Sequence, residues 1–496
     1  MLLDTETRYQ SVAACAGFRR ARQRLVVLCG TLLLTACATK DVGPINTFAP
    51  ELPKQTAGYI NDDGDDGSLI VGVAFSGGGT RAAAFAYGVL LELDSIRIDE
   101  VPRQRAVSDS IRMVSGTSGG AVAAAYFALK GPDEFDDFYE RFLLQNVEGS
   151  LNTSLGSPAN LTRALRGGMN DRNGFSRWLD DNLFESTTFA AYDTDHAPLV
   201  WLNATDIYHG VPFLFTHETF AALCSDLDQV LIADAVAASA ALPVAFAPID
   251  VMAYGPDCGY QIPDWKARAL DEPTASLRLN AYARALDSYI ADDSLKRVRL
   301  LDGGITDNIG ITGLSLARAS AENLHSPLSE EQAVNLKRLL FIVTDAGKAP
   351  IPAWATRERS PNLVELGPSL ANATIAASVR KGFDGLNLAV RNWQQDIISF
   401  RCGLSAERVR ELRGSLDGWD CSDVSITIEL LSFRDLEHPI QDQLNQIPTR
   451  LALPKEQVDL VVDAGRHAVR KNAGIQAAVD AFRQAPDRSG DQALTD

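Results

Sequence analysis

The sequence predicts an α/β fold of three layers, in which helices cover a mostly parallel central sheet and a C-terminal helical region follows. Short, almost wholly apolar runs such as residues 69–75 are typical of strands that are buried on both faces. Helical stretches rich in small residues follow the first of these runs. Strands and helices then alternate as far as residues 339–344, which is the order of a parallel sheet with helical crossovers.

The expected elements follow one another along the chain. Strands are expected at residues 69–75, 111–115, 199–203, 298–301 and 339–344, and helices at residues 80–94 and 119–129. Beyond residue 345, apolar side chains recur every three or four positions, at Ile375, Val379, Phe383, Leu386, Val390 and Trp393. This spacing predicts a helix, and we favour its packing on the sheet over a lid or membrane-contact helix. A late strand at 425–431 and a helix at 454–472 complete the pattern.

Two glycine-framed turns stand where an expected strand meets an expected helix. Ser118 lies in the sequence GTSGG at residues 116–120, a Gly-x-Ser-x-Gly elbow of the kind that lifts a serine hydroxyl out of a sheet edge. Gly77, Gly78 and Gly79 form a row of backbone N–H groups that no side chain blocks, which suits an oxyanion. A nucleophile and an anion cradle on neighbouring turns indicate acyl transfer.

The base expected for this serine is Asp302, because none of the six histidines lies at a comparable strand end. An apolar strand ends at Asp302, and two glycines follow it, so the backbone can turn sharply there. A carboxylate can act as base when it is shielded from water, because burial raises its pKa. Gly77, Ser118 and Asp302 each fall just past a strand, so we expect them to meet at the carboxyl edge of the sheet.

These elements resemble the patatin-like phospholipase family. The family pattern is a Gly-Gly-Gly-x-Arg oxyanion loop, a Gly-x-Ser-x-Gly nucleophile and an Asp-Gly-Gly or Asp-Gly-Ala base. The resemblance covers roughly residues 69–345 and includes LNATD at 202–206 and AASAALP at 237–243. The chain departs from the family at Ala82, where glycine is frequent, and at Ile309, near which a proline is common.

The resemblance implies a patatin-like fold and a serine lipid acyl hydrolase of the phospholipase A or lysophospholipase type. Ser118 and Asp302 would form a Ser-Asp dyad that works through an acyl-enzyme, with Gly77, Gly78 and Gly79 as the oxyanion hole. No metal ligands are visible, so we expect no metal and no cofactor. A phospholipid or other lipid ester would be the substrate, because each presents the same carbonyl to the serine.

Arg81, directly after the glycine loop, admits two roles. It can contact a substrate phosphate or carboxylate, or it can tie the loop to a neighbouring carboxylate or carbonyl. We favour the second role, and we expect Asp206 and Asn308 to organise loops as well. The spacing of Gly77, Gly79 and Ala82 also fits a dinucleotide-binding turn. That alternative leaves the serine elbow and Asp302 unexplained. A second alternative is a catalytically silent envelope lipoprotein that serves as a scaffold or partner-binding protein.

The first 36 residues are interpreted as a lipoprotein signal peptide. Four arginines between residues 19 and 24 precede an apolar stretch at 25–34 that is too short to span a membrane. Leu-Thr-Ala before Cys37 resembles a bacterial lipobox, so Cys37 is the expected lipidation site. An ordinary secretory signal is the alternative. We expect a lipid-anchored protein of the cell envelope, and Ala38 after the cysteine favours the outer membrane, on its periplasmic or surface face.

Charge and cysteine content limit the partners. The formal net charge of −18 opposes binding to nucleic acid, and it gives no attraction to anionic lipid, so the acyl anchor would hold the protein on the membrane. Four cysteines remain after Cys37, an even number for an oxidising compartment. We favour the pairs Cys224–Cys258 and Cys402–Cys421, each of which is near in sequence, over four free thiols.

The predicted domain organisation follows from these assignments. A flexible tether occupies residues 37–67, and the catalytic domain occupies 68–350, with insertions near 146–173 and 254–293. A mainly helical extension at 351–480 packs on the catalytic domain, and residues 481–496 form a polar tail.

Overall fold

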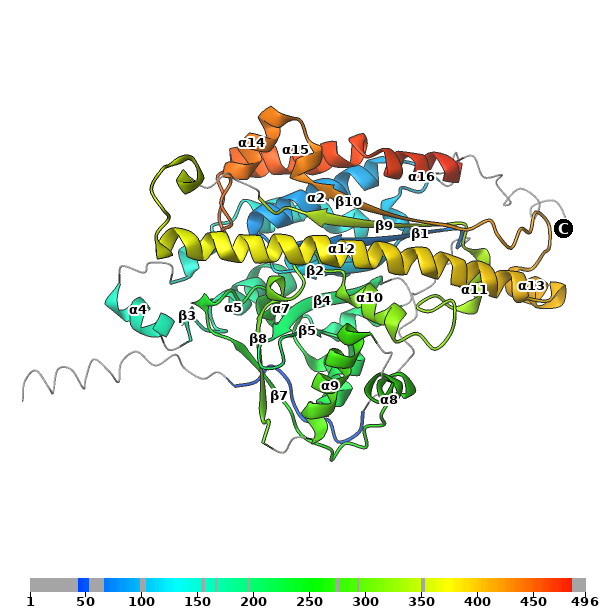
Figure 1. Ribbon diagram of the computed structural model, residues 1–496, viewed down its shortest axis with the longest axis horizontal. Coiled ribbons are helices and arrows are strands. Elements are labelled where there is room, and N and C mark those ends of the chain that lie inside the picture. The colour runs from blue at the N-terminus through cyan, green and yellow to red at the C-terminus, as the bar shows by residue number, and fades with distance from the viewer. Residues whose placement is uncertain are drawn as a thin grey trace, which may run out of the picture.

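The computed structural model describes residues 43–52, 67–98, 104–152, 157–165, 167–194, 197–272, 276–291, 294–348 and 353–483. The predicted signal peptide, the lipidation site Cys37 and most of the predicted tether and tail lie outside the described residues. The predicted fold class is confirmed, because helices cover a central, mostly parallel sheet on both faces (Figure 1). No helix in the described part of the chain is long and apolar enough to span a lipid bilayer.

The central sheet has the strand order β10-β9-β1-β2-β4-β8-β7, and β5 pairs with β4 away from this path. Its strands are β1 (Leu69–Phe75), β2 (Ile111–Thr117), β4 (Leu199–Asp206), β5 (Val211–Leu214), β7 (Ile249–Met252), β8 (Arg297–Asp302), β9 (Arg338–Asp345) and β10 (Ser425–Ser432). The pairs from β10 to β4 are parallel, whereas β5, β7 and β8 run antiparallel to their neighbours. A separate two-stranded sheet joins β3 (Gly168–Asn170) and β6 (Val244–Phe246).

The antiparallel course of β8 differs from what the sequence suggested. Parallel pairing of β2 with β4 ends at Thr117 opposite Asn203, but β4 continues to Asp206, beyond the carboxyl edge. Strand β8 begins beyond that edge and returns along β4, so that Asp302 lies opposite Ala204. The predicted meeting at one edge is therefore found, and it arises from a returning antiparallel strand rather than from the end of a parallel one.

Helices complete the two outer layers. The described helices are α2 (Thr80–Ser95), α3 (Gly119–Glu134), α4 (Pro158–Leu165), α5 (Phe175–Leu179), α6 (His217–Ala222), α7 (Ile232–Ser239), α8 (Asp264–Asp271), α9 (Leu277–Ala291), α10 (Thr312–Ala319), α11 (Glu330–Asn335), α12 (Leu363–Gly403), α13 (Ala406–Arg413), α14 (His438–Gln446), α15 (Lys455–Lys471) and α16 (Ala473–Arg483). Alternate residues of β1 enter different cores: Val71 and Val73 face the side of α2, α3 and α15, and Ile70 and Ala74 face the side of α12.

Helix α12 is a single long helix that crosses one face of the sheet (Figure 1). Its apolar stripe packs on this face, since Val379, Leu386, Val390 and Trp393 are buried with Met113 and other sheet residues. The structure thus places the stripe where we favoured it. Further towards the N-terminus of α12, Leu366 and Leu370 are exposed.

On the opposite face, α15 crosses α2 at very short range. A Cβ added at Gly88 would lie 2.1 Å from the carbonyl oxygen of Val462, and one added at Gly465 would lie 2.4 Å from that of Phe85. The buried carboxylate of Glu92 accepts hydrogen bonds from Arg466 at 3.1 Å and from Arg470 at 2.6 Å and 2.7 Å. Close backbone packing and paired charges therefore fix the C-terminal extension to the helix that follows the glycine loop.

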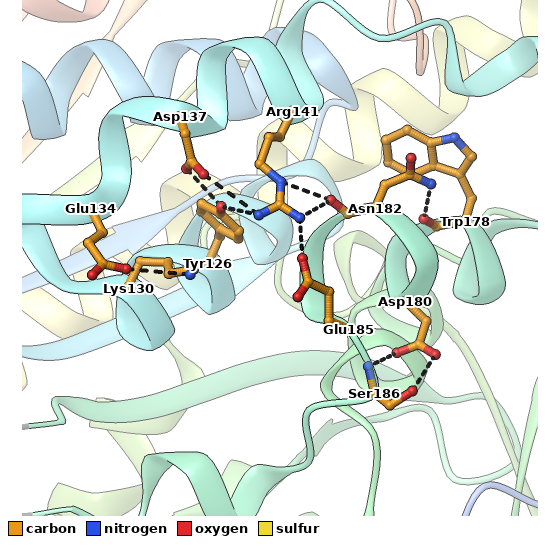
Figure 2. Close-up of polar contacts among 10 residues, drawn as sticks. All are labelled: Tyr126, Lys130, Glu134, Asp137, Arg141, Trp178, Asp180, Asn182, Glu185 and Ser186. Carbon is orange, nitrogen blue, oxygen red and sulfur yellow. Dashed lines mark hydrogen bonds and ion pairs between the residues drawn. The ribbon is translucent and has the colours of Figure 1, made fainter.

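Figure 2 shows how the far end of α3 is tied to the segment at residues 180–186. The guanidinium of Arg141 donates two hydrogen bonds to the carbonyl oxygen of Asn182, at 3.0 Å and 2.7 Å, and a third to Glu185 at 2.7 Å (Figure 2). On its other side the same guanidinium lies 3.7 Å from Asp137, to which Tyr126 of α3 donates at 2.7 Å. These contacts brace the helix that starts at Ser118.

The predicted tether is wrong for residues 43–52. Ile45, Asn46 and Ala49 are buried, and the side chain of Asn46 exchanges hydrogen bonds with the backbone of Met252, at 3.0 Å and 2.7 Å. The N–H of Ala49 donates to the carbonyl oxygen of Cys224 at 2.9 Å. A polar composition suggested a solvated linker, but these few apolar and amide side chains find partners on β7 and beside α6.

The four cysteines of the described residues are paired as Cys224–Cys258 and Cys402–Cys421, with Cα–Cα distances of 5.5 Å and 4.9 Å. The first bond fastens the start of the predicted insertion at 254–293, which contains α8 and α9, to the turn after α6. The second closes the loop that connects the end of α12 to β10.

Candidate active site

Ser118 stands at the sharp turn between β2 and α3. Its φ and ψ are 53° and −122°, a conformation that a non-glycine residue rarely adopts and that is typical of a nucleophile elbow. The turn needs glycine around it, because a Cβ added at Gly120 would lie 2.5 Å from the carbonyl oxygens of Phe75 and Ser76. The α3 helix begins directly after Ser118, so its positive end is directed at the hydroxyl.

The hydroxyl of Ser118 donates a hydrogen bond to Oδ2 of Asp302 at 3.0 Å. The two residues are 184 positions apart in the chain, and their exposed fractions are only 9% and 8%. The other carboxylate oxygen of Asp302 accepts the N–H of Gly304 at 2.8 Å, which fixes the orientation of the carboxylate. Burial raises the pKa of Asp302 to about 6, although the bonds from Gly304 and Ser118 oppose this rise.

The glycine loop reaches the serine, but one of its N–H groups is already used. The N–H of Gly77, predicted as an oxyanion donor, donates instead to the carbonyl oxygen of Asn308 at 2.9 Å and is therefore already engaged. The loop after Asp302 returns along the sheet edge and brings Asn308 opposite Gly77, which local sequence does not reveal. In the described part of the chain, the N–H groups of Gly78 and Gly79 have no acceptor, so they are the donors available to an oxyanion.

Contacts with the C-terminal extension hold the glycine loop in place. The N–H of Thr80 donates to the carbonyl oxygen of Arg450 at 2.8 Å, and a Cβ added at Gly79 would lie 2.4 Å from the same oxygen. Arg450 in turn pairs with Glu148, which also accepts the N–H of Leu451 at 2.8 Å. The sequence did not point to Arg450, because nothing in its local pattern marks a contact with a loop that lies so far away in the chain.

Arg81 is buried and bonded to backbone carbonyls. Its Nε donates to Ala346 at 3.0 Å and its Nη1 donates to Ile447 at 2.8 Å. Burial lowers the pKa of its guanidinium to about 10, and the nearby Asp345 opposes this shift. The structure therefore gives Arg81 the loop-organising role, tying the start of α2 to the end of β9 and to the segment after α14.

Ser239, at the end of α7, is a residue to which sequence reasoning gave no role. Its hydroxyl accepts the N–H of Ser118 at 2.8 Å and donates to the carbonyl oxygen of Asn203 at 2.6 Å. The N–H of Asp302 donates to the carbonyl oxygen of Ala241 at 3.0 Å, two residues further on. One short segment thus holds both members of the dyad. A serine within the alanine-rich run at 237–241 was the only available signal.

Comparison with known proteins agrees with this arrangement. Residues 73–315 match the model of the patatin-like phospholipase family, a span that contains Ser118 and Asp302. The chain also aligns with the structure of human GIVD cytosolic phospholipase A2, with a TM-score of 0.37 and 14% sequence identity. That alignment covers 84% of this chain and 63% of the human protein, so this chain spans less than two thirds of its length. None of the curated proteins matches the chain.

Proposed function

Because residues 73–315 form a patatin-like phospholipase domain, we propose that the chain is a serine lipid acyl hydrolase that cleaves phospholipid or lysophospholipid esters. The observation that carries the proposal is the hydrogen bond from Ser118 Oγ to Asp302 Oδ2, at 3.0 Å, in a site that is almost closed to water. An elbow serine paired with a buried carboxylate is suited to nucleophilic catalysis.

The proposed reaction has two halves. Ser118 Oγ attacks the ester carbonyl and passes its proton to Asp302, while the carbonyl oxygen becomes an oxyanion held by the N–H groups of Gly78 and Gly79. The bond to the alcohol then breaks, the departing oxygen takes the proton from Asp302, and the acyl group remains on Ser118. Water attacks this acyl-enzyme, gives a proton to Asp302, and the fatty acid leaves as that proton returns to Ser118.

The electrostatics of the site support this division of roles. A carboxylate with an ordinary pKa would be too weak a base for a serine hydroxyl, and the raised pKa of Asp302, about 6, brings its basicity closer to neutral pH. Removal of one oxyanion donor typically costs about 3 kcal/mol of transition-state stabilisation. The Arg450 carbonyl and Arg81, which fix the glycine loop, therefore support catalysis without touching the substrate.

We also propose that the enzyme works on the cell envelope, held by acyl chains on Cys37. The basis is the basic and apolar leader followed by Leu-Thr-Ala-Cys, as in a bacterial lipobox. One acyl chain gives only marginal membrane binding, whereas several give nearly permanent attachment. An anchored hydrolase would meet its lipid substrate without leaving the membrane surface.

The test is labelling of the full-length protein with a fluorophosphonate, which reacts only with an activated serine. Wild type should be labelled, Ser118→Ala should not, and Asp302→Asn should be labelled at least about a hundredfold more slowly, since it lacks the general base. Ser399→Ala, an exposed serine on α12, is the matched control and should label like wild type. A well-folded wild type that neither labels nor cleaves lipid esters would overturn the proposal and favour a scaffold.

A further inference from the structure

A pocket of about 290 Å³, lined by charged and apolar side chains, lies between α12 and the carboxyl ends of β9 and β10. Its walls carry both signs of charge: the guanidinium-bearing residues Arg380 and Arg434, and the carboxylate-bearing residues Asp345, Asp384 and Asp435. The Asp435 carboxylate accepts hydrogen bonds from the N–H and the hydroxyl of Ser432, at 2.7 Å and 3.0 Å. Phe383 and apolar side chains of α12 and β10 complete the lining. A pocket of this size is too small for a whole lipid and is suited to a compact group that is both charged and partly apolar.

The two arginines are available to an external anion. Within the described ranges, no hydrogen bond or ion pair engages the guanidinium of Arg380 or that of Arg434, and both residues are exposed. Arg81, the cation nearest the glycine loop, is committed to the carbonyl oxygens of Ala346 and Ile447. Recognition of a substrate phosphate at this edge of the sheet therefore falls to Arg380 and Arg434, whose planar groups suit phosphate oxygens.

The negative side of the pocket suits a cation. Asp384 is exposed on α12, one residue after Phe383, and Asp345 faces the same space from the end of β9. Burial raises the pKa of the Asp345 carboxyl, and the guanidiniums of Arg434 and Arg81 oppose this rise. An aromatic face together with a carboxylate is the environment that quaternary and primary ammonium groups prefer.

The pocket is close to the dyad. The N–H of Ala346, next to Asp345, donates to Ser76 Oγ at 2.9 Å, and a Cβ added at Gly77 would lie 3.3 Å from that of Ser118. Strands β9, β1 and β2 are neighbours in the sheet, so the ends of β9 and β2 are about 10 Å apart, two strand spacings. The glycerol and phosphodiester of a phospholipid can bridge this distance.

We propose that this pocket is the subsite for the zwitterionic headgroup of a glycerophospholipid. Its phosphate is bound by Arg380 and Arg434, and its ammonium lies against Phe383, Asp384 and Asp345. This inference rests on the proposed lipid hydrolase function and adds the class of headgroup. The residues of the pocket lie beyond the family match at residues 73–315, and all of them except Asp345 belong to the C-terminal extension.

The test compares soluble short-chain substrates that share their acyl groups: dihexanoyl phosphatidylcholine, dihexanoyl phosphatidylglycerol and dihexanoylglycerol. Wild type should show the highest kcat/KM for phosphatidylcholine. Arg380→Gln and Arg434→Gln should each lower the phosphatidylcholine-to-diglyceride ratio about tenfold, the effect of losing one hydrogen bond to a charged group. Asp384→Asn should reduce the difference in kcat/KM between phosphatidylcholine and phosphatidylglycerol. Arg391→Gln, an exposed arginine on α12 outside the pocket, is the control.

Inhibition experiments distinguish binding of a lipid headgroup from binding of free phosphate. Free phosphocholine should inhibit phosphatidylcholine cleavage more strongly than inorganic phosphate and should lose this advantage in Asp384→Asn. Equal inhibition by inorganic phosphate, or unchanged substrate ratios in both arginine variants, would overturn the headgroup assignment. If wild type cleaves none of the three substrates, the proposed function fails. In that case, titration calorimetry measures the affinity of phosphocholine for wild type and for Arg380→Gln, which tests the pocket independently of catalysis. Equal affinities for the two proteins would overturn the inference.

Discussion

At the residue scale, the site depends on a carboxylate that burial makes basic. Asp302 is 8% exposed, and its carboxylate accepts hydrogen bonds from the Gly304 N–H and the Ser118 hydroxyl, with no cation among its described partners. An ion pair would lower the pKa of this carboxyl, whereas burial raises it to about 6, against the opposing effect of the hydrogen bonds from Gly304 and Ser118. The ionised form of Asp302 is therefore destabilised by burial, which suits the proposed role of this residue as the base.

The pH dependence of the reaction follows from this charge. Because Asp302 must be ionised to accept the serine proton, kcat/KM should fall about tenfold per pH unit below its pKa of about 6 and level off above it. A rate profile on a soluble ester, from acid to neutral pH, measures this midpoint. A midpoint near the ordinary aspartate value of 3.8 would contradict the buried dyad.

The same shift predicts an effect on stability. The folded-state pKa lies above the unfolded value, so Asp302 contributes most stability when protonated, and the contribution is lost as pH rises from about 4 to about 6. The loss amounts to about 3 kcal/mol for a shift of about two units. Asp302→Asn is neutral at every pH and should therefore gain stability over wild type above pH 6, measured by urea unfolding. The difference in free energy of unfolding between Asp302→Asn and wild type should be larger at pH 8 than at pH 4. An equal difference at the two pH values would refute this account.

At the element scale, the crossing of α15 over α2 determines how firmly the glycine loop is held. Helix α2 begins at Thr80, whose N–H reaches Arg450, and the same extension then continues into α15, which crosses at Gly88 and Gly465. Two backbones can approach this closely only where neither carries a side chain. The glycine at 465 therefore has a packing role, despite its cost within a helix.

This role predicts opposite outcomes for two glycine-to-alanine variants. Gly465→Ala places a methyl group 2.4 Å from the carbonyl oxygen of Phe85, so it should destabilise the protein by roughly 1–3 kcal/mol even though alanine favours the helix. Gly385→Ala, on α12, meets nothing within 4 Å and should stabilise by about 0.5–1 kcal/mol. Thermal or denaturant unfolding of both variants measures the difference. If the two substitutions changed the free energy of unfolding equally, this result would contradict the close crossing of α2 and α15.

At the scale of the whole molecule, the catalytic dyad and its support come from different parts of the chain. The dyad lies within the patatin-like match at residues 73–315, whereas β9, β10 and the helices from α12 to α16 lie beyond it. These later elements supply one edge of the sheet, cover both faces, and hold Thr80 and Arg81 through Arg450 and Ile447. Removal of the extension should therefore disturb the oxyanion loop as well as stability.

The attachment of the whole molecule to the envelope is tested through Cys37. If Cys37 carries the lipid, Cys37→Ala should move the protein from the membrane fraction to the soluble fraction, because the substitution removes the thiol to which the acyl anchor is attached. Cys29→Ala, within the expected leader, is the matched control and should remain in the membrane fraction. Retention of Cys37→Ala on membranes after an alkaline wash would point to another mode of attachment.

The sequence by itself predicted the fold class, several of the strands and helices, and the two residues that are proposed to react. The apolar run at 69–75 became a strand with the predicted bounds, and Ser118 and Asp302 lie within hydrogen-bonding distance. These features depend on local sequence, because a continuous apolar run indicates a buried strand and glycines beside a serine indicate a nucleophile elbow. The same local signal failed for residues 43–52, whose few buried side chains find their partners far along the chain.

Only the tertiary structure decided which backbone groups face one another. In the structure β8 runs antiparallel to β4, so that Asp302 lies at the edge of the sheet opposite an extended β4. The N–H of Gly77 donates to the carbonyl oxygen of Asn308. The tertiary structure also fixed Arg81 on carbonyl oxygens far along the chain and placed Ser239 between the nucleophile and β4. Hydrogen bonds between segments depend on strand direction and register, and a local pattern of residues does not encode either.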